Sequence, residues 1–310
     1  MGSRLIRVIE ICQLTKSYGR VHAVRDLTFT VPDGLVTGFL GPNGAGKTTT
    51  LRMLLGLNTP TSGTATVDGR RVRELGLGLR HVGALLAADD VHKGRTARAH
   101  LRALARSNGL PARRVEEVLD EVGLTAAARR RVGGYSLGMR QRLGIAAALL
   151  GDPPVLVFDE PLNGLDPEGV RWVRDLLRRL AEQGRTVFVS SHMMSEMEHT
   201  ADRLVVIGHG RLIADETLRE FAARAAGAGS VRVRTPDGAV LAPLLARAGA
   251  VIAQEADGAL VVRGPSAEQI ARTALEHRVV LSEVTTQGGA LEDAFMALTS
   301  DSVEYRTGGR

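Results

Sequence analysis

The segment GPNGAGKTT, at residues 41–49, constrains the fold of this chain more than any other feature. Its spacing, G-x4-G-K-T, is that of a phosphate-binding loop, whose backbone N–H groups surround phosphate oxygens. A short apolar run, 35–40, precedes the loop, and the leucines after it predict a helix over 48–57. A strand, this loop and a helix in that order predict an α/β fold that binds a nucleoside triphosphate; a glycine-rich turn before an ordinary helix is the alternative.

The use of lysine supports this prediction. Only Lys16, Lys47 and Lys93 are lysines among the 40 Lys and Arg residues. A chain that otherwise uses arginine therefore has a lysine where a phosphate-binding loop needs a compact point charge for the β and γ phosphates. Thr48 is expected to supply a hydroxyl to Mg²⁺. The residues predicted to bind the nucleotide in this segment are Gly41, Pro42, Asn43, Gly44, Ala45, Gly46, Lys47, Thr48 and Thr49.

Composition excludes several classes of protein. A length of 310 residues with 44% hydrophobic content suits one large domain plus a small one. The longest apolar runs, such as 145–150, are far shorter than the ~20 residues that cross a bilayer, and the N-terminus shows no signal pattern. A single cysteine, Cys12, excludes an internal disulfide and suits a reducing cytosol. Its strand-like surroundings predict a small buried residue rather than a reactive thiol.

The charge balance leaves the partner open. A net charge of +6 and a pI of about 10.2 are compatible with nucleic acid, with an anionic membrane surface, or with neither. The arginines are not interleaved with aromatic residues of the kind that stack on bases, since aromatic content is only 3%. We therefore expect no nucleic-acid partner.

The chain is predicted to form two parts. In the first, an alternating pattern over 5–34 predicts paired strands, and 65–69 carries a further hairpin signal. Residues 95–145 are predicted to be mainly helical, and after them a buried strand, a helix and another strand give the rhythm of a parallel sheet. The predicted elements of this part include helices at 97–107, 113–122 and 168–182, and strands at 155–158, 186–190, 204–207 and 211–214.

A change of composition at 222–230, AARAAGAGS, is interpreted as the boundary. Beyond it the pattern predicts a small α+β unit without metal, nucleophile or phosphate motifs. Its predicted strands are 231–234, 250–254, 259–263 and 279–286, and its predicted helices are 241–248, 266–277 and 291–299. A packing domain is the favoured interpretation, with regulation, dimerisation or shielding of the first part as alternatives.

Two acidic residues follow the buried strand in VLVFDEP, residues 155–161. Ligands collect at such strand ends in α/β sheets. Asp159 is suited to hold Mg²⁺, directly or through water, and Glu160 is suited to polarise the water that attacks the γ-phosphate. A pair that caps a helix near Pro161 is the alternative. His192 follows the next predicted strand, where it can reach the γ-phosphate and that water.

The most discriminating segment is YSLGMRQR, residues 135–142, in which Ser136 can cap the helix that begins there. It resembles the signature sequence of ATP-binding cassette (ABC) ATPases, and the resemblance extends over about 5–222. It implies that Ser136 and Gly138 bind the γ-phosphate of ATP held by the opposite subunit. It further implies that Tyr18 stacks on adenine, that NGLD ending at Asp166 is the D-loop, and that His192 is the switch histidine.

Two positions depart from the family pattern. Leu137 and Met139 replace the first glycine and the glutamine of the signature. Ala87 stands where the family usually has a glutamine or an acid, in the Q-loop, that links Mg²⁺ to the membrane partner. Alanine has no ligand atom, so Asp89, Asp90 or a water molecule would have to replace it, and no Q-loop ligand is assigned.

The resemblance implies an α/β P-loop ATPase fold of the ABC type over 1–222, with a helical subdomain at about 95–145, and a small α+β domain over 223–310. It implies ATP and Mg²⁺ as cofactors, a separate integral-membrane permease and a second ATPase subunit, with a homodimer expected. The chain would lie in the cytoplasm, peripheral to the inner face of the cell membrane. The wider pattern, including LEDAFMALTS at the C-terminus, looks like subunits that power export of a drug, antibiotic or other hydrophobic compound.

Two other functions compete with this interpretation. A soluble ABC ATPase acting on ribosomes or DNA fits the basic pI, but such relatives usually have two cassettes or a long coiled-coil insertion. This sequence shows one phosphate-binding loop and no heptad run. A P-loop kinase or GTPase would leave residues 135–142 unexplained, and the sequence contains no Asn-Lys dipeptide for reading guanine.

Overall fold

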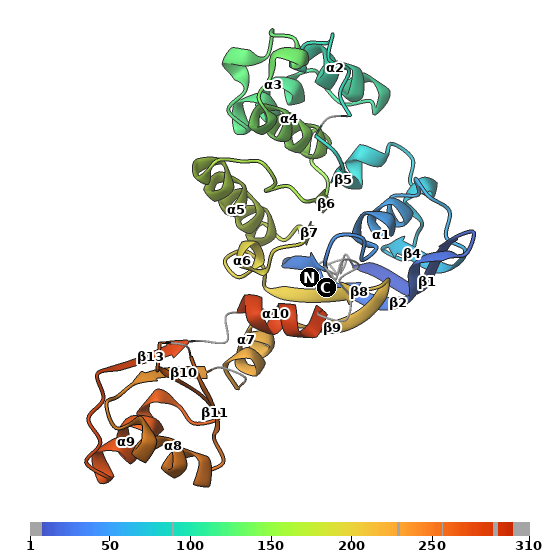
Figure 1. Cartoon of the computed structure of the whole chain (residues 1–310). Coiled ribbons are helices and arrows are strands. Elements are labelled where there is room, and N and C mark those ends of the chain that lie inside the picture. The colour runs from blue at the N-terminus through green and yellow to red at the C-terminus, as the bar shows by residue number, and fades with distance from the viewer. Residues whose placement is uncertain (1–7, 89, 228–229, 256, 288–290, 300–310) are drawn as a thin grey trace, which may run out of the picture. The chain divides into compact units, whose positions relative to one another are not determined.

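The computed structural model describes residues 8–88, 90–227, 230–255, 257–287 and 291–299 (Figure 1). The chain divides into two compact units between Thr217 and Leu218, which we call the N-terminal and C-terminal units. The boundary expected between 222 and 223 lies inside a helix, α7 (Leu218–Gly227), that the sequence analysis did not predict. The alanine-rich composition that we interpreted as a boundary is favourable for a helix.

A six-stranded sheet positions the predicted site in the N-terminal unit. Its strand order is β5-β6-β7-β3-β8-β9, and only β9 runs antiparallel to its neighbour. The strands are β3 (Val36–Leu40), β5 (Val82–Leu85), β6 (Val155–Asp159), β7 (Thr186–Ser191), β8 (Arg203–Gly208) and β9 (Arg211–Thr217). Every residue of β3, β6 and β7 is buried, as their continuous apolar sequences predict. Their carboxyl ends meet at one edge of the sheet, where ligands bind in such folds.

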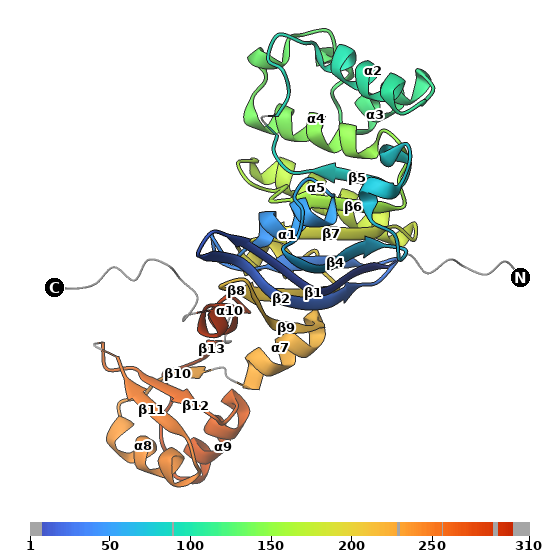
Figure 2. The same cartoon turned by 90° about the vertical axis from the view of Figure 1, so that its right-hand side faces the viewer.

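A second, antiparallel sheet has the order β2-β1-β4, with β1 (Ile9–Tyr18), β2 (Val21–Val31) and β4 (Ser62–Val67) (Figure 2). Helix α1 (Lys47–Leu54) buries Leu51 and Leu54 in a core shared with strands of both sheets. The phosphate-binding loop is therefore anchored from both sides by one apolar core.

The interpretation of Cys12 as a buried residue is wrong, because its side chain is exposed. Strand β1 alternates, with Ile11 buried and Cys12 on the outer face opposite Thr64 of β4. Since successive side chains of a strand point to opposite faces, the neighbour of a core residue faces outward.

The helical subdomain contains α2 (Ala97–Ser107), α3 (Arg113–Glu121) and α4 (Leu137–Leu149). The first two agree with the predicted helices at 97–107 and 113–122. Buried apolar residues from each helix, such as Leu101, Leu119 and Leu143, form its interior. The unit also contains α5 (Pro167–Glu182), α6 (Met194–Met197) and four single turns of 3₁₀-helix (Val72–Glu74, Gly78–Arg80, Thr125–Ala127 and Val132–Gly134).

The C-terminal unit is an α+β unit, as predicted. Its antiparallel sheet has the order β11-β12-β10-β13, and α8 and α9 contribute Leu241, Leu245 and Ile270 to its core. After α7, its elements are β10 (Ser230–Arg234), α8 (Gly238–Arg247), β11 (Val251–Gln254), β12 (Leu260–Arg263), α9 (Ala267–Glu276), β13 (Glu283–Gln287) and α10 (Leu291–Thr299). Across the described residues of both units, every helix is too short or too polar to span a bilayer.

Candidate nucleotide site

The phosphate-binding loop lies between β3 and α1, as the sequence predicts. Its last glycine, Gly46, caps α1 with a φ of 105°, in the region that glycine tolerates best. A Cβ atom at this position would lie 2.5 Å from the carbonyl oxygen of Ala23 on β2. Both the backbone conformation and this close approach therefore require glycine, and the helix N-terminus faces the loop with its first N–H groups unpaired within the helix.

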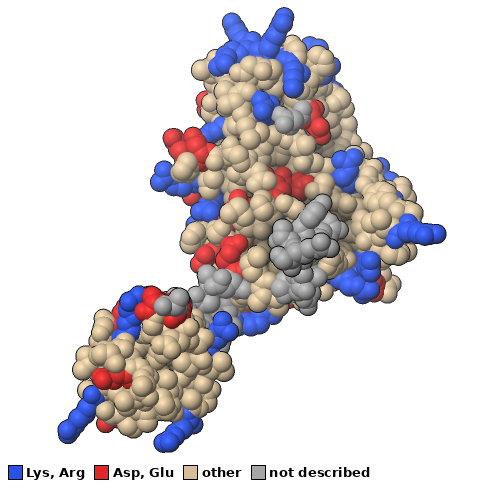
Figure 3. Space-filling view, in the orientation of Figure 1, with Lys and Arg blue, Asp and Glu red and all other residues tan. Residues whose placement is uncertain are grey.

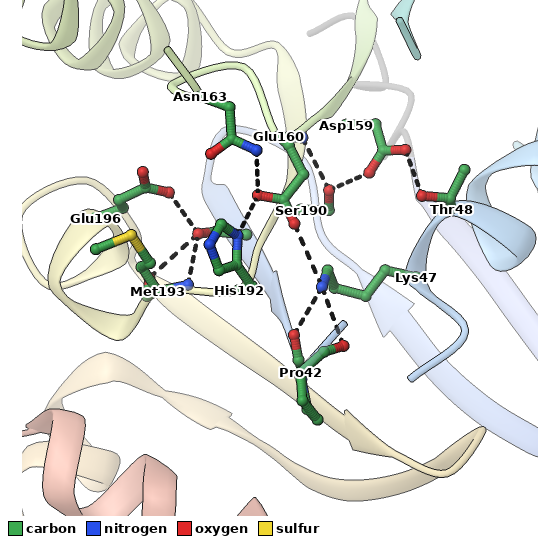
Figure 4. Close-up of polar contacts among 12 residues, drawn as sticks. Pro42, Lys47, Thr48, Asp159, Glu160, Asn163, Ser190, His192, Met193 and Glu196 are labelled. Atoms are coloured by element: carbon green, nitrogen blue, oxygen red, sulfur yellow. Dashed lines mark hydrogen bonds and ion pairs between the residues drawn. The ribbon is translucent and has the colours of Figure 1, made fainter. Parts of the chain in front are cut away.

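Lys47 is almost completely buried, with 5% of its surface exposed. Its Nζ atom donates to the carbonyl oxygens of Gly41, at 2.7 Å, and Pro42, at 3.4 Å. It also lies 3.3 Å from Oε1 of Glu160, a carboxylate at the end of β6 (Figure 4). A buried ammonium group needs such oxygen partners, because burial without them is very costly. The loop thus carries a positive charge held at the position where phosphate oxygens would bind.

Asp159 connects three elements through its two carboxylate oxygens. Oδ2 accepts a hydrogen bond of 2.7 Å from the hydroxyl of Thr48, 111 residues away in sequence, and Oδ1 accepts one from the hydroxyl of Ser190 on β7. The residue is 7% exposed. Sequence analysis predicted Asp159 and Thr48 but missed Ser190, since a serine in an apolar strand carries no local signal.

Glu160 lies directly after β6 and turns away from Asp159. Its φ is 50°, in the left-handed region that a residue with a side chain rarely adopts, and such conformations cluster at functional sites. Oε2 of Glu160 is 2.7 Å from Nδ1 of His192 and accepts a hydrogen bond of 3.2 Å from Asn163 (Figure 4). The structure therefore brings Lys47, Glu160 and His192, predicted from separate motifs, into one chain of contacts.

Gln141 and Glu196 were not predicted as site residues. Gln141, on α4, is buried and donates to the backbone oxygens of Glu160, at 3.3 Å, and Pro161, at 2.8 Å. It ties the signature helix to the turn that carries Glu160. A glutamine in a helix has no sequence signal for such a long-range contact.

Glu196, on the short helix α6, accepts a hydrogen bond of 2.5 Å from the hydroxyl of Ser191. The Ser191 oxygen in turn accepts the N–H of Met193, at 3.0 Å, so this network encloses the backbone of His192 (Figure 4). Burial raises the pKa of the Glu196 carboxyl above its ordinary value, and the charge of Glu160 adds to the rise, while the hydrogen bond from Ser191 opposes it. Glu196 therefore supports the turn that presents His192.

Lys47, Thr48 and Glu160 line a pocket of about 290 Å³, which we call the P-loop pocket. The lining comes from the loop, from the start of α1, and from the turn after β6. It comprises Ala23, Pro42, Asn43, Gly44, Ala45, Gly46, Lys47, Thr48, Thr49, Glu160 and Asn163. Of the residues predicted to bind the nucleotide in this loop, 42–49 all line the pocket and Gly41 does not.

Three other predicted residues, Ser136, Gly138 and Asp166, line a second hollow of about 360 Å³, the signature hollow. Ser136 caps α4 by accepting the N–H of Met139 at 3.2 Å, and Asp166 caps α5 by accepting the N–H of Gly169 at 2.8 Å. Both caps are exposed. The hollow is lined by Ser136, Leu137, Gly138, Met139, Arg142, Gly164, Leu165, Asp166, Glu168 and Gly169, so it shares no residue with the P-loop pocket.

The unusual Leu137 of the signature has a structural role in this hollow. A Cβ atom added to Gly164, whose φ is 71°, would lie 2.1 Å from Cδ2 of Leu137. The leucine thus occupies the space over a glycine of the D-loop. This contact joins the signature helix to the D-loop within the chain.

Five positions singled out by the sequence line neither hollow. Gly41, Asp159 and His192 contact residues that line the P-loop pocket, and the other two are Tyr18 and Ala87. Tyr18, at the end of β1, is 51% exposed; its hydroxyl accepts a hydrogen bond of 2.9 Å from Asn58, and Lys16 lies over its ring. An exposed ring leaves a face open for stacking. Ala87 follows β5 and is exposed, and neither it nor Asp90 lines the P-loop pocket. Asp89, the other suggested Q-loop substitute, lies outside the described residues.

The residues at the end of β6 fit a magnesium ion. The Thr48 hydroxyl and the Asp159 carboxylate are adjacent oxygen donors, which Mg²⁺ prefers, and the ion typically takes its remaining ligands from phosphates and water. The described residues contain no cluster of three or more His, Cys, Asp or Glu side chains suited to a metal. A small oxygen donor set beside a phosphate-binding loop therefore suits a metal that arrives with a nucleotide.

The fold and this pocket define a P-loop nucleotide hydrolase with a parallel core sheet. Comparison with known proteins extends this conclusion. The ABC transporter family model matches residues 24–163, and a domain of unknown function matches residues 229–292. A solved structure of the ATP-binding subunit of an ABC transporter has a TM-score of 0.64 at 28% identity and covers 70% of this chain and 92% of that one.

Two relatives identified by sequence are also transport or resistance ATP-binding proteins. The bacitracin transport ATP-binding protein of Bacillus licheniformis is 43% identical over 67% of this chain and 69% of its own length. The daunorubicin/doxorubicin resistance ATP-binding protein of Streptomyces peucetius is 36% identical over 99% of this chain and 97% of its own length. The chain therefore belongs to the ABC transporter ATP-binding proteins and is an ATPase, which confirms the predicted family and fold class.

Proposed function

We propose that the P-loop pocket and the signature hollow are two halves of one ATP site, completed when two copies of the chain face each other. The observation that carries the proposal is their separation within one chain. Lys47, Thr48, Asp159 and Glu160 are held together around one pocket, whereas Ser136, Gly138 and Asp166 lie in a hollow that has none of them. Asn163 and Gly164, adjacent in sequence, line one hollow each, so the D-loop would couple the two halves.

In the P-loop pocket, Lys47 would exchange its carbonyl partners for phosphate oxygens of ATP. Thr48 and Asp159 would hold Mg²⁺, which neutralises charge on the phosphate oxygens when it is bound. The exposed ring of Tyr18 would stack on adenine. In the facing copy, the N-terminus of α4 behind Ser136 and Gly138 would bind the γ-phosphate, because a helix N-terminus attracts anions.

Glu160 is the group best placed to accept a proton from the attacking water. Its carboxylate faces the pocket, and contacts with His192 and Asn163 fix its orientation. A positioned general base contributes about 10²–10⁴-fold to a rate. His192 would hold the carboxylate and contact the γ-phosphate, and Gln141 would keep the turn of Glu160 in place.

We propose further that ATP-driven closure of the two copies acts on a separate integral-membrane permease, at the inner face of the cell membrane. The named relatives are transport and resistance proteins, which supports the transporter interpretation over a soluble ATPase that acts on ribosomes or DNA. Their names point to a drug, an antibiotic or a similar compound as cargo, moved outward.

A complementation experiment tests the shared site. Lys47→Ala and Ser136→Arg each disable one half, so each variant alone should lack ATPase activity. In a mixed dimer, the intact P-loop pocket of one copy faces the intact signature hollow of the other, and activity should return in part. If the mixture stays inactive while light scattering shows that mixed dimers form, the two halves do not share a site.

The permease is tested separately. Tagged Glu160→Gln protein, loaded with ATP and recovered from detergent-solubilised membranes, should bring a polytopic membrane protein in a fixed ratio. Ribosomal proteins or nucleic acid in its place would favour the soluble alternative and leave the ATPase chemistry unaffected.

A further inference from the structure

The positive charge of the chain is concentrated in the helical subdomain. Residues 95–145 contain 11 arginines against four acidic residues, whereas the rest of the chain has 29 Lys and Arg against 30 Asp and Glu. The net charge of +6 is therefore a property of this subdomain. Such segregation creates a local field that uniformly spread charges would not. Figure 3 shows Lys and Arg side chains gathered over the subdomain, at the top of the view.

Part of this charge forms a stripe on α2. The helix buries Ala97, Leu101 and Ala105, while Arg98, Arg102 and Arg106 follow one another on another face because they are spaced four residues apart. Two exposed alanines lie beside the stripe. Together with a neighbouring arginine they form a hollow of about 530 Å³, lined by Thr96, Arg98, Ala99, Arg102, Ala103, Arg106 and Arg129. We call it the arginine hollow.

The arginine hollow has little acid to neutralise it. Glu116 on α3 forms ion pairs with two of its arginines, with oxygens 2.6 Å from Arg98 and 3.7 Å from Arg102. The Nε atom of Arg98 is buried and has no hydrogen-bond partner. Among the residues that the structure describes, none forms an ion pair with Arg106 or Arg129. The hollow thus keeps most of its charge available for an external anion.

Other arginines of the subdomain are used inside it. Arg114 donates to the backbone oxygens of Leu149 and Leu150, and Arg142 donates to that of Val122 and stacks on Trp172. These contacts cap or brace helices. Among the described residues, the side chains of the stripe donate to no backbone oxygen, and only Arg98 and Arg102 reach α3, through Glu116. Packing of the subdomain therefore does not account for the whole stripe.

We propose that the arginine hollow is a docking surface for the headgroups of anionic phospholipids. The proposal rests on the proposed function, which places the chain beside a membrane permease. Guanidinium groups bind phosphate oxygens through paired hydrogen bonds, and basic clusters are attracted to anionic membrane surfaces. The alanines leave room for a phosphate to approach between the arginines.

The surface suits a lipid better than a protein segment. Protein interfaces depend on large side chains that fill pockets at their centre. Across the described part of 78–136, no large hydrophobic side chain is exposed, and the apolar residues that line the hollow are alanines. A contact made of charge alone fits a headgroup layer, and it would orient α2 toward the membrane.

Vesicle binding tests the proposal with the full chain. The probes are vesicles of phosphatidylglycerol mixed with phosphatidylcholine, and vesicles of phosphatidylcholine alone. The stripe variant carries Arg102→Gln, Arg106→Gln and Arg129→Gln, all exposed positions. The control variant carries Arg171→Gln, Arg178→Gln and Arg247→Gln, which are also exposed and remove the same charge. ATPase activity of both variants should match that of the unaltered chain.

We expect the unaltered chain and the control to bind only the anionic vesicles, and the stripe variant to bind them about 10²-fold more weakly. Equal losses in the two variants would show that net charge alone acts, and equal binding to both kinds of vesicle would exclude headgroup recognition. If the unaltered chain ignores vesicles but the stripe variant loses the permease, the surface contacts protein and the proposal is wrong. ATPase and complementation assays contain no vesicles, so their failure is distinguishable from failure here.

Discussion

The P-loop pocket and the signature hollow differ in how their polar groups are used. In the P-loop pocket, Lys47 and Asp159 are almost fully buried, and each side chain contacts groups from distant parts of the sequence. In the signature hollow, Ser136 and Asp166 are exposed, and each satisfies only the N-terminus of its own helix. One region is a buried site that a single chain builds, and the other is an exposed surface whose ligand, in the proposed shared site, would come from a facing copy.

The difference teaches how a hydrolase can be controlled by association. Burial strengthens electrostatic interactions, so the groups that carry charge belong in a pocket that one chain builds completely. The N–H groups of a helix N-terminus attract anions even when they are exposed, so they can lie at the surface of the unliganded chain. If the two hollows form one site as proposed, hydrolysis would depend on the contact between two copies.

The largest expected effect on the rate of hydrolysis comes from replacing Glu160, the proposed general base in the P-loop pocket. Glu160→Gln should slow ATP hydrolysis by at least ~10²-fold, because the amide cannot accept the proton, and ATP affinity should stay nearly unchanged. The matched control is Glu182→Gln, the same exchange at an exposed position at the end of α5 that lines neither hollow, and it should leave turnover close to normal. Phosphate release and nucleotide binding measure the two quantities. Normal turnover of Glu160→Gln would remove the basis for calling this pocket the catalytic half.

A second variant tests phosphate binding. Lys47→Ala should weaken ATP binding by about 10–100-fold, since it removes charge-assisted hydrogen bonds to the phosphates. Lys93→Ala, at an exposed lysine, is the control and should bind ATP normally. Equilibrium titration with a fluorescent ATP analogue measures both. Retained affinity in Lys47→Ala would contradict the assignment of the loop.

A substitution in the signature hollow should affect dimer formation rather than ATP binding. Ser136→Arg should spare ATP binding by a single copy but prevent the ATP-driven dimer, because the larger side chain fills the surface that meets the facing phosphate. Ser266→Arg is the control, since Ser266 likewise caps a helix, α9, in the C-terminal unit. Loss of either cap costs about 1 kcal/mol of stability, so folding effects should be similar. Light scattering with ATP distinguishes the variants, and dimers of Ser136→Arg would refute the shared site.

The smallest expected effect concerns the turn behind His192. The pKa of Glu196 is raised above its ordinary value of 4.5, so its contribution to stability is complete below that pH and is lost as pH rises through the folded-state pKa. Glu196→Gln cannot ionise and should lose less stability over this range. Its melting temperature relative to the unaltered chain should therefore rise as the pH increases above 4.5, by a few degrees at most. Glu198→Gln, the same exchange at an exposed position nearby, is the matched control.

Much of the P-loop pocket could be predicted because its signals are local. The glycine spacing before Lys47 and the Asp159-Glu160 pair at a strand end each fall within a few residues, and their chemistry follows from residue type. The signature hollow required a resemblance, since Ser136 on its own indicates only a helix cap. Glu196 and Gln141 escaped prediction because their roles depend on contacts with other segments.

The sequence by itself determined the strands, the phosphate-binding loop, most of the helices and the identity of the charged groups, because these follow from periodicity and short motifs. Only the tertiary structure decided which groups meet. Parallel pairing aligns Asp159 with Ser190, and the position of α1 against the sheet brings Thr48 to the same carboxylate. It also separated Ser136 from Lys47 and turned Cys12 outward. Such outcomes depend on the order and register of strands far apart in sequence, which no local pattern records.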